Sequence, residues 1–103
     1  MSQIGRTTAL VKSLPAAGAL IIVPSRDIGL VIERTILELR GPDVDSRCKT
    51  LTICQPGDLD LIAAGLPVFF DHTFDDMTPR ELREEAHARA RESNRHYWPV
   101  SRA

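Results

Sequence analysis

The stretch ALIIVPSRDIGLVIERTILELRG, residues 19–41, decides the fold. Residues 19–24 form a continuous apolar run rich in β-branched side chains, which is typical of a strand buried on both faces of a parallel sheet. Ser25 is a favoured helix N-cap, and apolar side chains then recur at helical spacing over residues 26–40. Gly41 and Pro42 end that helix. The expected apolar stripe is Ile28, Val31, Ile32, Thr35, Ile36 and Leu39, widened by Leu30 and Leu37.

The same alternation of strands and helices continues on both sides of this stretch. We expect helices over residues 7–14, 58–64 and 78–97, the last opened by a capping box at Thr78 with Pro79 as its first residue. Strands are expected over residues 48–54 and 66–71, and loops over 43–47 and 72–77. The order α-β-α-β-α-β-α predicts an α/β fold, a small three-stranded parallel sheet with helices on its faces. Residues 1–77 would form a Rossmann-like or P-loop-like core. Residues 78–103, a charged C-terminal helix and an aromatic tail, would belong to the same single domain.

Composition and charge restrict the class of protein. The chain has 103 residues, 43% of them apolar and 26% charged, as expected of a globular domain. A net charge of −1 does not support binding to nucleic acid or to an anionic membrane. We find no signal peptide and no run of about 20 apolar residues. Cys48 and Cys54 fall on one expected strand, too far apart for a disulfide, so we expect two free thiols, both in or near the core, and a cytoplasmic protein.

The segment Gly5-Arg6-Thr7-Thr8 has two interpretations. It lies where the first expected helix begins, and the N–H groups and dipole at such a place attract anions. Thr7 or Thr8 could then hydrogen-bond a phosphate or hold a magnesium ion. The alternative is a plain start of the chain in which a threonine caps the helix.

Three segments in this order resemble the P-loop NTPases, in particular the first RecA-like core of helicases and phage terminase motors. Gly5-Arg6-Thr7-Thr8 resembles the end of their phosphate-binding loop, G-x-x-x-x-G-K-[ST]. Residues 19–39 resemble the strand and helix that follow it. LPVFFDHTFDDM, residues 66–77, resembles their Walker B strand, which ends in an aspartate. The resemblance implies a nucleotide site for ATP or GTP with magnesium, in which Asp71 orders the metal's water shell.

The sequence departs from that family at three positions. The strand and the first glycine that precede such a loop are missing, Arg6 stands in place of the loop lysine, and His72 stands where a catalytic glutamate follows the aspartate. Phosphoryl transfer depends on positioning and on stabilisation of charge, so we do not expect a complete enzyme and assign no catalytic residue. Asp71, His72, Asp75 and Asp76 match no metal-site spacing, and no protein-bound metal site is expected either.

The tail HYWPV, residues 96–100, holds the only Trp and the only Tyr of the chain. Aromatic and arginine side chains are enriched in protein-binding hot spots, so Arg91, Arg95, Tyr97 and Trp98 are candidate partner-binding residues. The alternative is that Tyr97 and Trp98 fold back onto an end of the sheet.

Two functions are therefore expected. The first is a non-catalytic interaction or regulatory protein with a protein partner, such as a phage-encoded inhibitor of a host nucleic-acid or defence complex. The alternative is a nucleotide- or phosphate-binding mini-domain with weak or no NTPase activity. A three-stranded sheet leaves an exposed edge, which also favours a homodimer.

Overall fold

The computed structural model describes residues 3–62 and 65–95, except for the side chains of Gln3 and Ile4. The elements in chain order are α1 (Gln3–Ser13), β1 (Leu20–Val23), α2 (Arg26–Arg40), α3 (Pro42–Arg47), β2 (Lys49–Thr52), the 3-10 helix η1 (Pro56–Leu61), β3 (Val68–Phe70), α4 (His72–Met77) and α5 (Arg80–Asn94).

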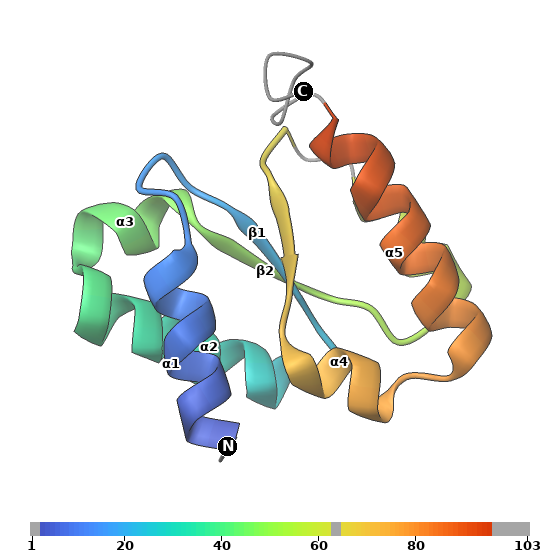
Figure 1. Ribbon diagram of the computed structural model, residues 1–103, viewed down its shortest axis with the longest axis horizontal. Coiled ribbons are helices and arrows are strands. Elements are labelled where there is room, and N and C mark those ends of the chain that lie inside the picture. The colour runs from blue at the N-terminus through green and yellow to red at the C-terminus, as the bar shows by residue number, and fades with distance from the viewer. Residues whose placement is uncertain (1–2, 63–64, 96–103) are drawn as a thin grey trace.

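The three strands form a parallel sheet, as the sequence predicts, and the structure gives their order as β2-β1-β3. Leu20 pairs with Lys49 on one side and with Val68 on the other, so β1 is the central strand. Helices cover both faces of the sheet, with α1, α2 and α3 on one side and α5 on the other (Figure 1). The expected small α/β fold is therefore confirmed.

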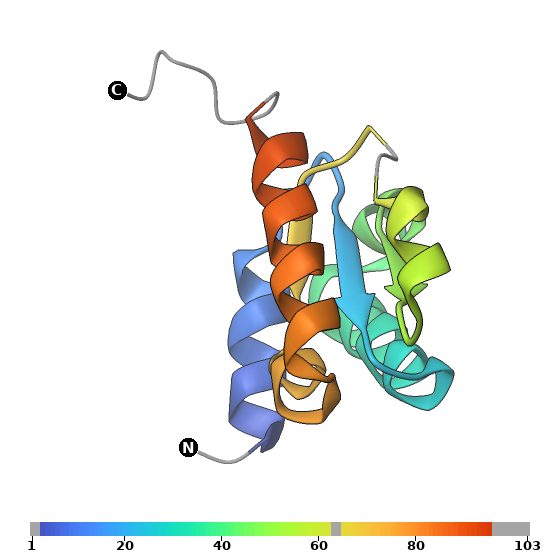
Figure 2. The same cartoon turned by 90° about the vertical axis from the view of Figure 1, so that its right-hand side faces the viewer.

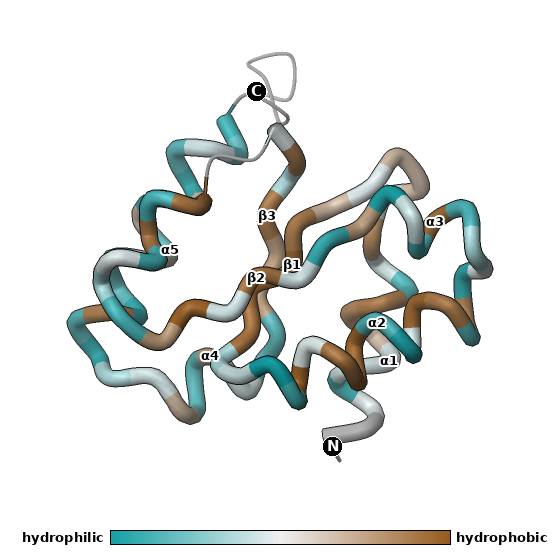
Figure 3. The backbone as a smooth tube through the Cα atoms, turned by 180° about the vertical axis from the view of Figure 1, so that it is seen from behind, coloured by the Kyte–Doolittle hydropathy of each residue, from teal (hydrophilic) through white to brown (hydrophobic). Residues whose placement is uncertain are grey.

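Alternating residues of β1 supply the two halves of the core. Leu20 and Ile22 pack with η1, α4 and α5, whereas Ile21 and Val23 pack with α1 and α2. All four residues of β1 are buried, which explains why this segment reads as a continuous apolar run. Figure 2 shows β1 between α5 and η1, and Figure 3 shows its hydrophobic stretch in the middle of the molecule.

Local structure differs from the expectation in four segments. Residues 43–47 and 72–77 are the helices α3 and α4 rather than loops. Pro42 occupies the first turn of α3, where its missing N–H costs nothing. The expected capping box at Thr78 is wrong, because Pro79 itself is the N-cap of α5 and Thr78 ends α4. The expected helix after Asp58 is the 3-10 turn η1, which begins at Pro56.

The expected stripe of α2 is only partly buried. Ile32 and Ile36 are in the core, but Val31 is 57% exposed and Leu39 is 46% exposed. Leu30 and Leu37, expected to widen the stripe, are 53% and 47% exposed. The buried face is narrower than predicted because α1, α3 and the sheet cover only one side of this helix, so its outer face stays apolar and exposed.

The two cysteines are both free, as expected, but only one of them is near the core. Cys48 packs against the α1–α2 side of the core, and burial raises the pKa of its thiol. Cys54 is exposed, because β2 ends at Thr52 and the chain turns there into η1. The expectation that both thiols are buried is therefore wrong for Cys54.

The two edge strands, β2 and β3, differ in how their outward backbone groups are hydrogen-bonded. The Asn94 side chain accepts a hydrogen bond from the N–H of Val68 (2.7 Å) and donates one to its carbonyl (3.1 Å). The end of α5 thus satisfies the outward backbone groups of β3 at this position. Among the described residues, no side chain forms such a pair of hydrogen bonds with the outward backbone groups of β2.

Candidate ligand-binding site

The candidate site lies at the carboxyl ends of the neighbouring strands β1 and β3. After β1, the chain turns at Pro24 and enters α2, which packs on one face of the sheet. After β3, it enters α4, whose Phe74 packs on the other face. When neighbouring parallel strands send their connections to opposite faces, a crevice opens between their carboxyl ends, and α/β proteins bind ligands there.

A pocket of about 280 Å³ occupies this crevice. The first turns of α2 and α4 and the amino-terminal half of α1 lie at this end of the sheet (Figure 1). Apolar side chains of α2 form one wall, and hydroxyl groups, one carboxylate and one imidazole form the rest. The lining residues are Thr7, Thr8, Ile28, Val31, Ile32, Thr35, Asp71, His72 and Thr73.

Asp71 is the buried charged residue of this pocket. Its backbone N–H donates to the carbonyl of Ile22 at 3.0 Å, which fixes it to the end of β1, and the residue is 1% exposed. One carboxylate oxygen, Oδ2, accepts hydrogen bonds from the backbone N–H and the hydroxyl of Thr73. The other oxygen, Oδ1, is buried without a hydrogen-bond partner. A buried charged oxygen without a hydrogen-bond partner raises the free energy of the folded state. A ligand that donates a hydrogen bond to this oxygen would remove that cost.

His72 lies directly beside that oxygen. Its Nδ1 is 3.6 Å from Asp71 Oδ1, which is beyond hydrogen-bond distance but close enough for an ion pair if the imidazole is protonated. Both of its ring nitrogens are buried without a hydrogen-bond partner. Asp71 and His72 both line the pocket, and together they hold three buried polar atoms that lack hydrogen-bond partners.

The position of α1 over the pocket is set by Arg40, a residue at the end of α2. Its guanidinium donates to the carbonyls of Val11 (2.8 Å) and Leu14 (2.7 Å) at the end of α1. The Val11 carbonyl also accepts the N–H of Leu14 at 3.3 Å, and Arg40 supplies further donors to this end of the helix, so Arg40 acts as a C-cap from another element. The side chains of Val11 and Leu14 also pack on α2.

The structure corrects the expected form of Gly5-Arg6-Thr7-Thr8. The expected helix over residues 7–14 begins four residues earlier, at Gln3, so this segment is part of α1 and not a loop. Thr7 and Thr8 lie beyond the first turn, where their N–H groups point to carbonyls of the preceding turn. Thr7 and Thr8 line the pocket with Asp71 and His72, whereas Arg6 is exposed and does not line it.

A nucleotide phosphate with magnesium would find only part of the groups that it needs in this pocket. Thr7 or Thr8 and Asp71 share one pocket, as the resemblance to P-loop proteins implies. Two other requirements are not met: within residues 3–62 and 65–95 no Lys or Arg lines the pocket, and a helix replaces the loop whose N–H groups would surround the phosphate. In the part of the chain that the structure describes, no three His, Cys, Asp or Glu side chains gather to hold a metal ion. The site therefore fits a triphosphate poorly.

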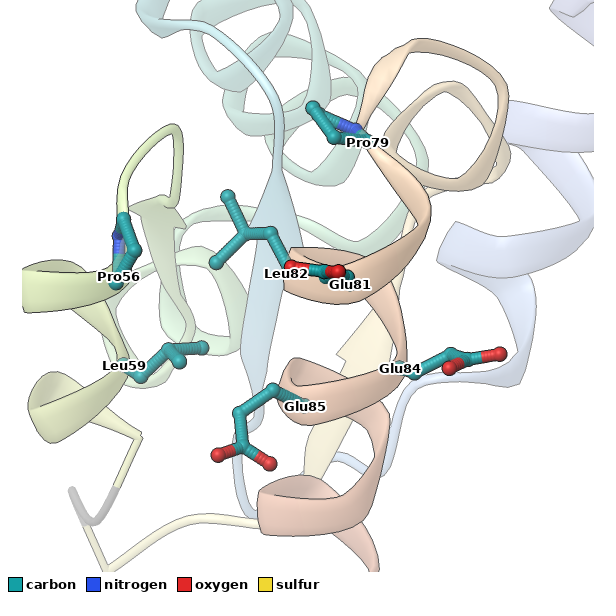
Figure 4. Close-up of a pocket in the computed structure, with 7 residues that line it drawn as sticks. All are labelled: Pro56, Leu59, Pro79, Glu81, Leu82, Glu84 and Glu85. Atoms are coloured by element: carbon teal, nitrogen blue, oxygen red, sulfur yellow. The ribbon is translucent and has the colours of Figure 1, made fainter.

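Two other hollows of the described surface are less suitable. A groove of about 670 Å³ lies between η1 and α5, and Figure 4 shows Leu59 and Leu82 pointing into it. Its polar groups are exposed glutamates, one of which, Glu84, pairs with Arg80. A second groove, of about 620 Å³, contains His87, whose Nε2 lies 2.6 Å from Asp75 Oδ1 and whose ring stacks on Phe70. The polar partners in both grooves are already satisfied or solvated.

The candidate partner-binding residues are only partly described. Arg91 is exposed near the end of α5, and the exposed Arg95 pairs with Glu92 at 3.0 Å. Tyr97 and Trp98 lie outside the described residues. The two interpretations of the tail, folded back onto the sheet or bound to a partner, therefore both stay predictions.

No family model, curated protein or solved structure matches the chain, so the resemblance to P-loop proteins rests on the quoted motifs alone. Within residues 3–62 and 65–95, none of the helices is both long and apolar enough to cross a membrane.

Sequence reasoning found Asp71, His72, Thr7 and Thr8 but missed the apolar wall and the three unpartnered atoms. Val31 and Ile32 were both expected in the core stripe of α2. Ile32 is in the core and Val31 is exposed, yet both line the pocket, and this arrangement depends on the tertiary fold rather than on the helical pattern. Arg40 was also missed, because a cap between two distant helices leaves no local pattern.

Proposed function

We propose that this protein is a non-catalytic binding domain whose ligand occupies the pocket at the carboxyl ends of β1 and β3. The observation that carries the proposal is that Asp71 lines a pocket with an apolar side and has a buried carboxylate oxygen, Oδ1, without a hydrogen-bond partner. Enclosed apolar pockets with a few convergent polar groups are the usual form of small-molecule sites. The volume of about 280 Å³ suits a small ligand or one group of a larger one.

A catalytic role has less support. The groups that polarise water or stabilise a developing charge in phosphoryl transfer are a metal ion, basic side chains and backbone N–H groups. The pocket wall offers one carboxylate and one imidazole in place of this set. For phosphoryl transfer, these groups support binding of a ligand better than turnover.

The proposal is tested by a fragment screen monitored through the backbone amides in ¹H–¹⁵N NMR spectra. We expect hits to shift the amides of Thr8, Ile32 and Thr73, which come from three different elements around the pocket. Arg83 and Glu84 line the groove that contains His87 and provide the comparison within the same spectra. Hits that shift only these amides, or no hits at millimolar concentration, would contradict the proposal.

A second candidate function is binding to another protein, and the outer face of α2 favours it. Leu30 and Leu37 are separated by two helical turns and are about half exposed. Exposed apolar side chains on one helix face are characteristic of protein contacts. Loss of a biological effect in Leu30→Ser with Leu37→Ser, in a protein with unchanged thermal stability, would support this role.

A homodimer would use the edge of β2, because Asn94 already pairs with the edge of β3. Lys49 and Ile53 direct their N–H groups to β1, so that of Thr52 points outward. We expect sedimentation velocity to show a dimer at high concentration that Thr52→Pro abolishes, since proline removes this outward donor but no bond within the sheet. A monomer at all concentrations would remove the dimer from the proposal.

A further inference from the structure

We infer that the ligand of the β1–β3 pocket carries an alkylammonium group, whose charge meets Asp71 and whose aliphatic part lies against α2. This inference deepens the proposed function and rests on it. The occupant would be a small aliphatic amine or a lysine side chain, since both present the same chemistry.

The sign of the charge follows from the residues on the pocket wall. Of the residues that the structure describes, Asp71 is the only Asp or Glu that lines the pocket, and no Lys or Arg among them lines it. The 99% buried carboxylate has one oxygen satisfied by Thr73 and one with no hydrogen-bond partner. A cation that donates hydrogen bonds satisfies this oxygen and compensates its charge, whereas an anion would add repulsion to a buried charge.

The shape of the ligand follows from the opposite wall. Ile28, Val31 and Ile32 present aliphatic carbon to the pocket. A bare metal ion would leave this wall without contacts and would find one carboxylate and one imidazole where three or more protein ligands are usual. An aliphatic chain of a few carbons with one cationic end complements both walls.

His72 completes the recognition. An ammonium group has three donors, and its two donors beyond the bond to Asp71 need acceptors. An uncharged imidazole has one acceptor nitrogen, and the nearer of the two, Nδ1, lies 3.6 Å from Asp71 Oδ1. Both atoms are buried in the unliganded chain, so one ammonium group bridges them after small rotations of the two side chains. The hydroxyls of Thr7 and Thr8 line the same pocket and can accept the third hydrogen bond.

The test compares three ligands of the same carbon skeleton by ¹H–¹⁵N NMR titration at neutral pH. The probes are n-butylammonium chloride, n-butanol and sodium butyrate. We expect n-butylammonium to shift the pocket amides with a dissociation constant at least tenfold below that of n-butanol, and butyrate to cause no shift. In Asp71→Asn this preference should fall below twofold, while Thr35→Val, which changes the same pocket without its charge, should keep it.

The outcomes separate the two proposals. Equal binding of n-butylammonium and n-butanol would overturn the inference of a cation and leave the binding pocket in place. Tighter binding of butyrate or of inorganic phosphate would overturn the sign of the charge. No shift of a pocket amide with any probe, together with an empty fragment screen, would remove the proposed function as well. Because the ligand series decides these points on the unmodified chain, they hold even if Asp71→Asn does not fold.

The two sources of the amine are distinguished by a second pair of probes. N-acetyl-lysine methylamide carries the butylammonium group on a peptide backbone, and n-butylammonium carries it free. Tighter binding of the lysine derivative supports a protein partner that inserts a lysine, and tighter binding of n-butylammonium supports a free amine. If neither amine binds in the pocket, the inference of an alkylammonium ligand fails.

Discussion

At the residue scale, the two carboxylate oxygens of Asp71 have different surroundings. One oxygen caps α4 through Thr73, and the other is left without a hydrogen-bond partner at the pocket. Its place after a buried strand identified it in the sequence, since the carboxyl ends of parallel strands are where α/β proteins hold functional groups. The division between the two oxygens could not be predicted, because it depends on the helix that begins at His72, in a segment expected to be a loop.

Asp58 provides a test of pH dependence. Hydrogen bonds from the backbone N–H groups of Cys54, which has the largest effect, and of Gln55 lower the pKa of Asp58 below its ordinary value of 3.8. Because the folded state favours the ionised form, this residue stabilises the fold above about pH 4, and the contribution is lost as the pH falls through the lowered folded pKa. We expect Asp58→Ala to lower the free energy of unfolding at pH 7, with the difference from wild type shrinking toward pH 3.

The measurement for Asp58 is urea unfolding between pH 3 and pH 8. Asp76→Ala, which removes an exposed carboxylate from α4, is the control and should stay close to wild type throughout. A difference between Asp58→Ala and wild type that is the same at pH 3 and pH 7 would refute the role of this carboxylate.

Gly18 has a backbone conformation that residue types other than glycine rarely adopt. Its φ is +115°, and an added Cβ would lie 2.3 Å from the carbonyl oxygen of Arg47. We expect Gly18→Ala to lower the free energy of unfolding by roughly 2 kcal/mol or more, since both the dihedral angle and the contact are unfavourable. Gly57→Ala is the matched control, because nothing lies within 4 Å of its added Cβ. Equal stability of the two variants in chemical denaturation would contradict this reading.

At the element scale, strands and long helices were predictable and short helices were not. The apolar run that became β1 and the capped helix α2 each carry a strong local pattern, at Leu20–Val23 and from Ser25 onward. The helices α3 and α4 have six residues each, too few for a periodic pattern to show. α2 also shows the limit of periodicity, because Val31 fits the stripe but lies more than half exposed at the pocket.

The link between α1 and α2 gives a prediction at this scale. Arg40→Gln removes the guanidinium that caps the carbonyls of Val11 and Leu14. We expect a loss of about 2 kcal/mol in the free energy of unfolding, measured by chemical denaturation. Arg34→Gln, on the exposed part of the same helix, controls for the loss of charge and should change it by less than about 0.5 kcal/mol. If both variants lose the same amount, the contribution of Arg40 is its charge and not its cap.

At the scale of the whole molecule, the fold places two segments far apart in the sequence on one pocket. Thr7 and Thr8 of α1 and Asp71 and His72 of the β3–α4 junction were expected at one site from their resemblance to P-loop motifs, and they do line one pocket. The chemistry of that pocket was not predictable, because α1 is helical where a phosphate loop was expected and Arg6 lies outside. The structure thus brings these four residues together, and the ligand of the pocket stays a proposal.

The measurement that tests the central claim most directly is fragment binding to a protein whose pocket has been filled. Val31 lines the pocket at its exposed rim, so Val31→Phe should occupy it with little effect on the core. Leu30→Phe adds the same ring to the neighbouring residue, which does not line the pocket. We predict that fragments bound by wild type in NMR titrations keep their dissociation constants in Leu30→Phe and lose at least tenfold in affinity in Val31→Phe. Unchanged binding to Val31→Phe would contradict the account.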